Sequence, residues 1–283
     1  MNTTSSRGWR DKYRSAKMQS VLRKALVAEK ICEVDRSDNY RIQNPYSNQP
    51  TATVQAIAGT YSVTAWTQTD DTLTVTDEVI YSEHIFDFER LLNNYDLFST
   101  RTDEQAYAVA ERVDAFVLNN LLEDGTGTYT TPAGGFTSAA NINTIMSNLI
   151  SKVAGYETAY KGLFLVIENT DVPGFIQAQA SNGFSFADAA LNNGFMTSYM
   201  GVDIYVKRAG TFDDVTIGTT SVTNLNHRVF GVKGSATMAL PGGVHFEEKP
   251  VTGKTGIEFV TVMLVGFKLW AQKAALIIDI TLA

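Results

Sequence analysis

The chain has 283 residues, 44% of them hydrophobic, which is enough to bury one large core or two smaller ones and excludes a disordered tail. Its formal net charge is −7, and its single cysteine, Cys32, excludes an intrachain disulfide framework and a four-cysteine zinc site. The most apolar stretch near the C-terminus is interrupted by Lys268, Gln272 and Lys273, so we expect no membrane-spanning helix.

The N-terminal segment differs in charge from the rest of the chain. Residues 1–36 hold nine Lys or Arg and four acidic residues, whereas the remainder holds 14 basic and 26 acidic residues. This segment is polar at its start, without the apolar core of a secretory signal. A basic arm on an acidic body fits either nucleic acid or a neighbouring copy, and we favour the second interpretation because it uses both halves of the asymmetry. Helical spacing within the arm predicts a short amphipathic helix with the apolar residues Met18, Val21, Leu22, Ala25 and Leu26.

The next segment, 39–88, is rich in threonine, valine and aromatic residues that alternate in the manner of strands, as in "TYSVTAW" and "LTVTDEVIYSEHIF". Asp70 and Asp71 lie between these two stretches and predict a turn. The segment therefore reads as a long two-stranded ribbon. Its few apolar residues are not enough to stabilise an isolated hairpin in water, so the ribbon needs a partner.

A long helix follows in "STRTDEQAYAVAERVDAFVLNNLLEDG", where Thr100 or Thr102 is the expected N-cap and Gly125 the expected stop. About 24 residues at 1.5 Å each give a rod about 35 Å long. Its apolar stripe consists of Ala106, Val109, Ala110, Val113, Val117 and Leu121.

The remaining chain alternates helices and strands, which implies an α/β layer. A helix is expected to begin at Thr137 or Ser138 and to end at Gly155, and another to begin at Asp171 with Pro173 in its first turn. Strands are expected at 162–168, in "MGVDIYVKRAG", in "HRVFGVKGSATMAL" and in the closing "KLWAQKAALIIDITL".

The sequence contains no convincing catalytic motif. The triplet Gly253-Lys254-Thr255 lacks the first glycine of a phosphate-binding loop, and the β-branched residues after it predict a strand where that loop requires a helix, so a turn between two strands is expected. The three histidines have no metal-ligand spacing, and a dyad of Cys32 with a histidine has no support. Asp87 and Glu89 lie just before the long helix, where acidic side chains cap the helix or face solvent, so we do not expect them to form a catalytic pair. We therefore expect no enzyme activity, no cofactor and no metal.

The order of these elements resembles the major capsid proteins of tailed bacteriophages, whose fold is shared with encapsulin shells and the floor domain of herpesvirus capsids. The matching stretches are "LTVTDEVIYSEHIFDFE", "AYAVAERVDAFVLNNLL", "GVDIYVKR", "RVFGVKGSATMAL" and "GFKLWAQKAALIIDI", which cover nearly the whole chain from about Asn39. The resemblance implies an α+β fold with an N-terminal arm (1–38), an extended E-loop β-ribbon (39–86), a P-domain with a long spine helix (87–125 and 229–283) and an α/β A-domain (126–228).

The same resemblance implies that the arm and the E-loop make the contacts between subunits. The candidate contact residues are Met18, Val21, Leu22, Leu26, Arg41, Tyr61, Trp66, Asp70 and Asp71.

The implied function is that of a major capsid protein that self-assembles through hexamers and pentamers into an icosahedral shell around packaged double-stranded DNA. Portal, scaffolding and decoration proteins are further expected partners, and contact with DNA is expected to be loose because the body is acidic. The implied location is the virion capsid, assembled in the host cytoplasm. Two alternatives are an encapsulin-type shell around a protein cargo and an α/β enzyme with a β-ribbon lid.

Overall fold

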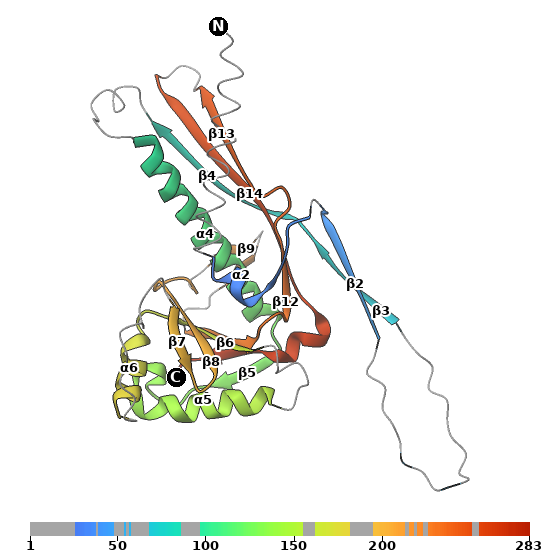
Figure 1. Cartoon of the computed structure of the whole chain (residues 1–283), viewed down its shortest axis with the longest axis vertical. Helices are drawn as coiled ribbons and strands as arrows, with labels where there is room; N and C mark the ends of the chain where they lie inside the picture. Colours follow the sequence, from blue (N-terminus) through green and yellow to red (C-terminus); the bar gives the residue numbers. More distant parts are fainter. Residues whose placement is uncertain are drawn as a thin grey trace.

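The computed structural model (Figure 1) describes residues 26–37, 39–47, 54, 57, 68–85, 97–154, 162–181, 195–212, 215–217, 220–222, 226–250 and 255–283. Within these ranges the chain forms two large sheets joined by one long helix, together with two two-stranded sheets, and the predicted α+β class is confirmed. None of the helices in these ranges combines the length and the apolar character needed to cross a lipid bilayer.

The first sheet is built around β14 (Ile257–Leu269), a strand of 13 residues. Its strand order is β1-β12-β14-β13, and β4 pairs with the other edge of the first half of β14; the bounds are β1 (Glu33–Asp35), β12 (Ala236–Ala239), β13 (Val244–Pro250) and β4 (Asp77–Ile85). Residues of β14 alternate between full burial, as at Phe259 and Met263, and partial exposure, as at Val260 and Val262. Only one face of this sheet therefore lies against the core.

The long helix α4 (Leu97–Asp124) covers that face, as Figure 1 shows. Its 28 residues make a rod about 42 Å long, and every residue of the predicted apolar stripe is buried. The predicted stop is confirmed, because the helix ends directly before Gly125. The predicted N-caps are wrong, because Thr100 and Thr102 lie inside the helix. A capping interaction contributes only about 1 kcal/mol, which is too little to decide where a long helix begins.

The second sheet has six strands in the order β5-β15-β11-β6-β8-β7. The bounds are β5 (Gly127–Thr130), β15 (Ile277–Thr281), β11 (His227–Val232), β6 (Leu163–Glu168), β8 (Val202–Lys207) and β7 (Phe195–Tyr199). Two further short strands, β9 (Val215–Ile217) and β10 (Thr220–Val222), form a separate hairpin. The sheet thus takes two of its strands from the C-terminal part of the chain.

Helices α5 (Ala139–Val153) and α6 (Val172–Ser181) cover one face of the six-stranded sheet, together with the 3-10 turn η1 (Gly135–Thr137). Helix α5 begins directly after Ser138, as predicted, and buries its apolar stripe against the alternate residues of β6 and β8. The opposite face of the same sheet packs into the core that contains α4. Helix α4 therefore packs against both sheets.

A buried ion cluster holds the start of α6 to the sheet. Arg228 on β11 donates from Nε to Asp171 at 2.6 Å and from Nη2 to Glu168 at 3.0 Å, and its guanidinium lies 5.6 Å from the centre of the Phe212 ring. Asp171 directly precedes α6, as predicted, but its carboxylate accepts from Arg228 and from the backbone N–H of Glu168. All three charged side chains are buried, so each depends on the others for its partners.

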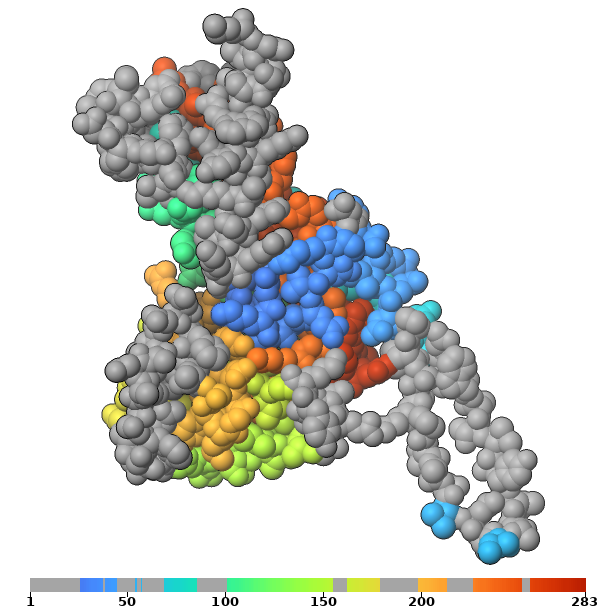
Figure 2. Space-filling view, in the orientation of Figure 1, coloured from blue at the N-terminus to red at the C-terminus, as the bar shows by residue number. Residues whose placement is uncertain are grey.

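The range predicted as an arm, 1–38, contains part of the body. Leu26, Val27, Ala28 and Ile31 are buried in the core of α4, α2 spans Ala28–Ile31, and β1 pairs in parallel with β12. In the space-filling view, the blue surface of α2, β1 and β2 crosses the middle of the molecule and meets the red C-terminal segment (Figure 2). The described part of this range is therefore a structural element of the subunit.

The carboxylate of Asp114, fully buried on α4, fixes the start of this element. It accepts the backbone N–H of Val27 at 3.0 Å and of Ala28 at 2.8 Å, and the ammonium of Lys207 on β8 lies 2.7 Å from its Oδ2. An acidic group beside the first N–H groups of a helical turn satisfies donors that have no partner within the turn. Asp114 thus joins α2, α4 and the six-stranded sheet.

The predicted pairing within the ribbon is wrong. Strand β3 (Gln68–Thr74) pairs with β2 (Arg41–Ser47), whereas β4 pairs with β14, so Asp70 and Asp71 lie inside a strand rather than in a turn. Alternation along a sequence shows that a strand has two unlike faces, but it does not identify the partner strand. The turn preference of aspartate is weaker than the pairing of a whole strand.

We predict that replacing Asp114 destabilises the subunit. The variant Asp114→Ala leaves the partly buried ammonium of Lys207 and two buried N–H groups without their acceptor, so the free energy of unfolding should fall by about 3 kcal/mol. Denaturant unfolding followed by circular dichroism measures this. The control is Glu111→Ala on the same helix, an exposed acid 3.9 Å from Arg208, whose loss should cost under about 1 kcal/mol. Equal losses in the two variants would contradict the assignment.

Candidate subunit-contact surfaces

The β2–β3 ribbon, defined as β2, β3 and the chain between them, is attached to the body by a small apolar cluster. Leu73 on β3 is fully buried against Ala239 and Trp270, with Ile42 and Val75 packed beside them. Gly266 on β14 makes this possible, because a Cβ there would lie 2.8 Å from a methyl carbon of Val75. The backbone of the ribbon base therefore crosses β14 at a distance that only glycine allows.

A second contact at the ribbon base is polar. The carboxylate of Asp71 accepts the backbone N–H of Ala271 at 3.1 Å and lies 3.3 Å from the ammonium of Lys268. It also accepts the N–H of Thr72 at 3.0 Å. Asp70, next to it in the strand, is exposed on the opposite face. The two candidate aspartates therefore lie in different surroundings, and Asp71 contacts its own subunit.

Beyond its base the ribbon carries no charge. No Asp, Glu, Lys or Arg occurs in 42–69, and the side chains of Val54 and Ile57 are fully exposed. The strands β2 and β3 run away from the sheet around β14 (Figure 1). Val54 and Ile57 are therefore accessible for contact with another molecule.

The sheet around β14 offers a second apolar surface, on the face opposite α4. Ile80 on β4 is more than half exposed, and Val262 lies directly beside it in the neighbouring strand. Val260 and Leu264 lie on the same face of β14 and are partly exposed. We call these four residues the outer stripe. Polar residues border it, among them Glu78, Ser82, His245 and Glu247.

A groove of about 390 Å³ lies between β1 and the ribbon base. Its lining is mainly polar and includes two acids, Glu33 and Asp35, beside Lys273. Hydrogen bonds to Ser37 hold the pKa of Asp35 below its usual range, so this carboxyl stays ionised at neutral pH. The groove therefore presents two carboxylates and one ammonium group.

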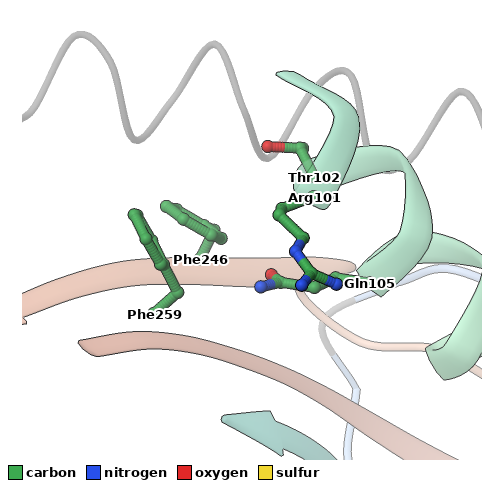
Figure 3. A pocket seen from close by; sticks show the side chains of 5 residues that line it. All are labelled: Arg101, Thr102, Gln105, Phe246 and Phe259. Atoms are coloured by element: carbon green, nitrogen blue, oxygen red, sulfur yellow. The ribbon is translucent and has the colours of Figure 1, made fainter. Parts of the chain in front are cut away.

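A depression between the start of α4 and the sheet is too small to hold a water molecule. Figure 3 shows Arg101 and Gln105 on the helix facing Phe246 and Phe259 on the strands. Their polar groups have partners within the subunit: Glu83 contacts Arg101 at 3.3 Å and accepts from Gln105 at 3.2 Å. The phenyl rings pack with their centroids 5.6 Å apart. This arrangement joins α4 to β4 and does not form a ligand site.

The residues weighed for chemistry in the sequence do not come together in the described part of the chain. Cys32 is buried, and burial, together with the charges of Asp114 and Glu33, raises the pKa of its thiol, which disfavours a nucleophilic thiolate. Strands β13 and β14 flank the Gly-Lys-Thr triplet and pair antiparallel, as the prediction of a turn between strands requires. In the described ranges no three His, Cys, Asp or Glu side chains are arranged to hold a metal ion. Asp87 and Glu89 lie outside the described residues.

The nine contact candidates have different positions. Leu26 is buried in its own subunit, whereas Arg41 is exposed at the start of β2. Asp70 is exposed and Asp71 is bonded to the body, as described above. The other five, Met18, Val21, Leu22, Tyr61 and Trp66, lie outside the described residues.

Sequence reasoning missed Val54, Ile57, Gly266 and Lys268. Two signals were available: an uncharged stretch of 28 residues, and a glycine inside a strand otherwise rich in β-branched residues, which is typical of a close backbone approach.

Comparison with known proteins identifies the fold. No protein-family model matches the chain, and no curated protein matches its sequence. Among solved structures, the capsid of the cyanophage P-SCSP1u matches with a TM-score of 0.69 at 13% identity, over 92% of this chain and 88% of that one. Mycobacterium phage Che8 matches with a TM-score of 0.66 at 16% identity, over 87% and 88%. A virus-like particle from Pyrococcus furiosus matches with a TM-score of 0.62 at 10% identity, over 95% and 98%.

The first two of these matches extend over 92% and 87% of this chain. The chain therefore has the fold of the major capsid proteins of tailed bacteriophages.

Proposed function

We propose that this protein is the major capsid protein of a tailed bacteriophage, a structural and non-enzymatic subunit that assembles with copies of itself into a shell. The observation that carries this proposal is the fold, which matches phage capsid structures over 92% and 87% of the chain. We further propose, from the expected E-loop, spine helix and A-domain, that assembly proceeds through hexamers and pentamers into an icosahedral shell around double-stranded DNA.

In this proposal the domains keep the expected division: an N-terminal arm (1–38), an E-loop (39–86), a P-domain (87–125 and 229–283) and an A-domain (126–228). The arm ends inside the subunit core, because α2 and β1 are packed there. The sheet of the A-domain also contains β11, which extends across the C-terminal limit of the domain, and β15, which lies beyond it.

The ribbon supplies the contact between neighbouring copies. From Arg41 to Ile57 the chain can reach at most about 55 Å, farther than the length of α4, so the ribbon tip can extend over an adjacent subunit. Its exposed aliphatic residues match the outer stripe in character, and the absence of charge removes repulsion from an acidic body. A tip on one surface and a stripe on another give a heterologous contact, which generates rings.

The N-terminal residues 1–25 supply a second, electrostatic contact. They hold seven basic residues and one acid, whereas residues 26–283 hold 16 basic and 29 acidic residues. The acidic groove beside β1 is the described surface best suited to such a segment from another copy. Packaged DNA is held loosely, because the body carries the same sign of charge as the phosphates.

The setting that follows is a virion capsid assembled in the host cytoplasm. Portal, scaffolding and decoration proteins are further proposed partners.

A shell around a protein cargo, as in encapsulins, is the second candidate. The match to the virus-like particle from Pyrococcus furiosus, which covers 98% of that chain, favours it. The contents of purified particles distinguish the two candidates: a phage capsid should contain nucleic acid, whereas an encapsulin-type shell should contain a protein cargo.

The first prediction tests assembly through the ribbon tip. The double variant Val54→Asp, Ile57→Asp should fold but form no shells, because each carboxylate would be desolvated in an apolar contact. Size-exclusion chromatography and negative-stain microscopy measure the outcome. The matched control exchanges the two aliphatic residues (Val54→Ile, Ile57→Val) and should assemble. A parent protein that stays a compact monomer under all assembly conditions would exclude the shell function.

The second prediction separates the arm from the body. Deletion of 1–25 should leave the thermal stability of the subunit unchanged and impair assembly. Deletion of 1–36 should unfold the subunit, because it removes Leu26, Ile31 and the strand β1 from the core. Circular dichroism and microscopy measure both variants. Normal shells from the shorter deletion would argue against a contact by 1–25.

The third prediction concerns covalent cross-links. An isopeptide bond needs a lysine amine, and no lysine occurs between Ile31 and Ser151; the arginines there stay protonated and are not nucleophiles. Mature particles boiled in SDS should therefore contain no bond formed by an E-loop lysine. A covalent ladder whose amine donor maps to 39–86 would overturn this, whereas a bond from Lys152 or Lys161 would not.

A further inference from the structure

The direction in which the ribbon leaves the body is fixed by the residues at its base. Asp71, Leu73 and Val75 occupy alternate positions, so their side chains lie on the face of the chain that meets the body. Leu73 and Val75 pack where β14 has Gly266. Asp71 lies two residues farther out and contacts Lys268 and Ala271. With a single contact the ribbon could rotate about that contact, whereas two contacts along the strand fix the direction of the ribbon.

The polar contact of Asp71 lies farther along the ribbon than the apolar contact of Leu73. The Asp71 side chain is only 15% exposed, and it contacts the Lys268 side chain and the backbone N–H of Ala271, which follows β14. The backbone of Ala271 opens the 3-10 turn η3 (Ala271–Leu276), which is held in turn by Trp270, whose Nε1 donates to Thr237 at 2.9 Å. Asp71 therefore contacts a part of the subunit that is itself hydrogen-bonded to β12.

We propose that Asp71 is a positioning residue that fixes the angle of the ribbon to the body and thereby selects the curvature of the assembled shell. This inference rests on the proposed function in one respect only: the ribbon must be the contact between copies. In a closed shell every copy must meet its neighbour at nearly the same angle, and a small change at the base is multiplied along the ribbon.

The size of the effect follows from the length of the attachment. Residues 71–75 span about 13 Å of extended chain and residues 73–75 about 7 Å. If the end contacts have the same positional freedom, loss of the outer contact increases the angular freedom of the ribbon about twofold. The apolar cluster of Leu73, Ala239 and Trp270 remains, so the fold should be retained.

The test compares Asp71→Ala with Asp70→Ala. Both changes remove one carboxylate from the same strand, but Asp70 is exposed and lies on the other face. Spin labels on dissociated subunits at Val54→Cys, on the ribbon, and Arg208→Cys, on the body, report the ribbon angle by the distance between them. The native Cys32 is buried and should not take the label.

The width of the distance distribution should increase about twofold in Asp71→Ala and stay at the parent value in Asp70→Ala. Lys268→Met, which removes the ionic partner, should widen it as well. Under assembly conditions Asp71→Ala should form shells of mixed diameter or open sheets by electron microscopy. Thermal unfolding checks that each variant is folded.

Equal distance distributions in parent and folded Asp71→Ala would overturn the proposal, as would uniform shells of parent diameter from that variant. If the parent forms no shells while Asp71→Ala still widens the distribution, the positioning role stands and the shell function fails. The two conclusions are therefore tested separately.

Discussion

The burial of α4 between two sheets is the constraint on which the rest of the subunit depends. Its residues pack against β4 and β14 along one part and against β11 and β15 along the other, so both sheets share one core. Neither sheet could keep its position if this helix moved, because close-packed interiors transmit displacement. The six-stranded sheet has a second core with α5 and α6, whereas the sheet around β14 shares the first core with α4 and α2. Among the described residues, one sheet is therefore covered on both faces, and the other is covered on the face that α4 contacts.

Buried charges set the geometry at the joints of this arrangement. Asp114, on α4, joins the start of α2 to β8, and Arg228 joins the start of α6 to β11. Such pairs contribute little net stability compared with apolar groups of the same size, but removal of one partner is costly. Their value lies in allowing one arrangement of the elements. If subunits assemble as proposed, a single arrangement matters more than a small gain in stability, because the angle of each contact depends on it.

The sequence predicted the helices well and the strand partners poorly. The stripe of α4, the start of α5 and the strand β6 follow from periodicity within a single segment. The pairing of β4 with β14 joins segments about 180 residues apart, and nothing in the alternation of either strand identifies the other. The same limit explains why Asp71 was assigned to a turn. Its role depends on Lys268 and Ala271, which no local pattern connects with it. The buried position of Leu26 was missed for a related reason: an apolar stripe shows that a surface must be covered but not by what.

In the proposed assembly, the uncharged ribbon and the basic N-terminal segment would make two contacts that respond in opposite ways to ionic strength. Apolar burial is unaffected or slightly strengthened by added salt, whereas attraction between a basic segment and an acidic surface is screened within about 10 Å at 0.1 M. A shell held by both would keep its ribbon contacts in concentrated salt and tighten its arm contacts in dilute medium. Such a shell would therefore keep at least one of the two kinds of contact between its subunits in both dilute and concentrated salt.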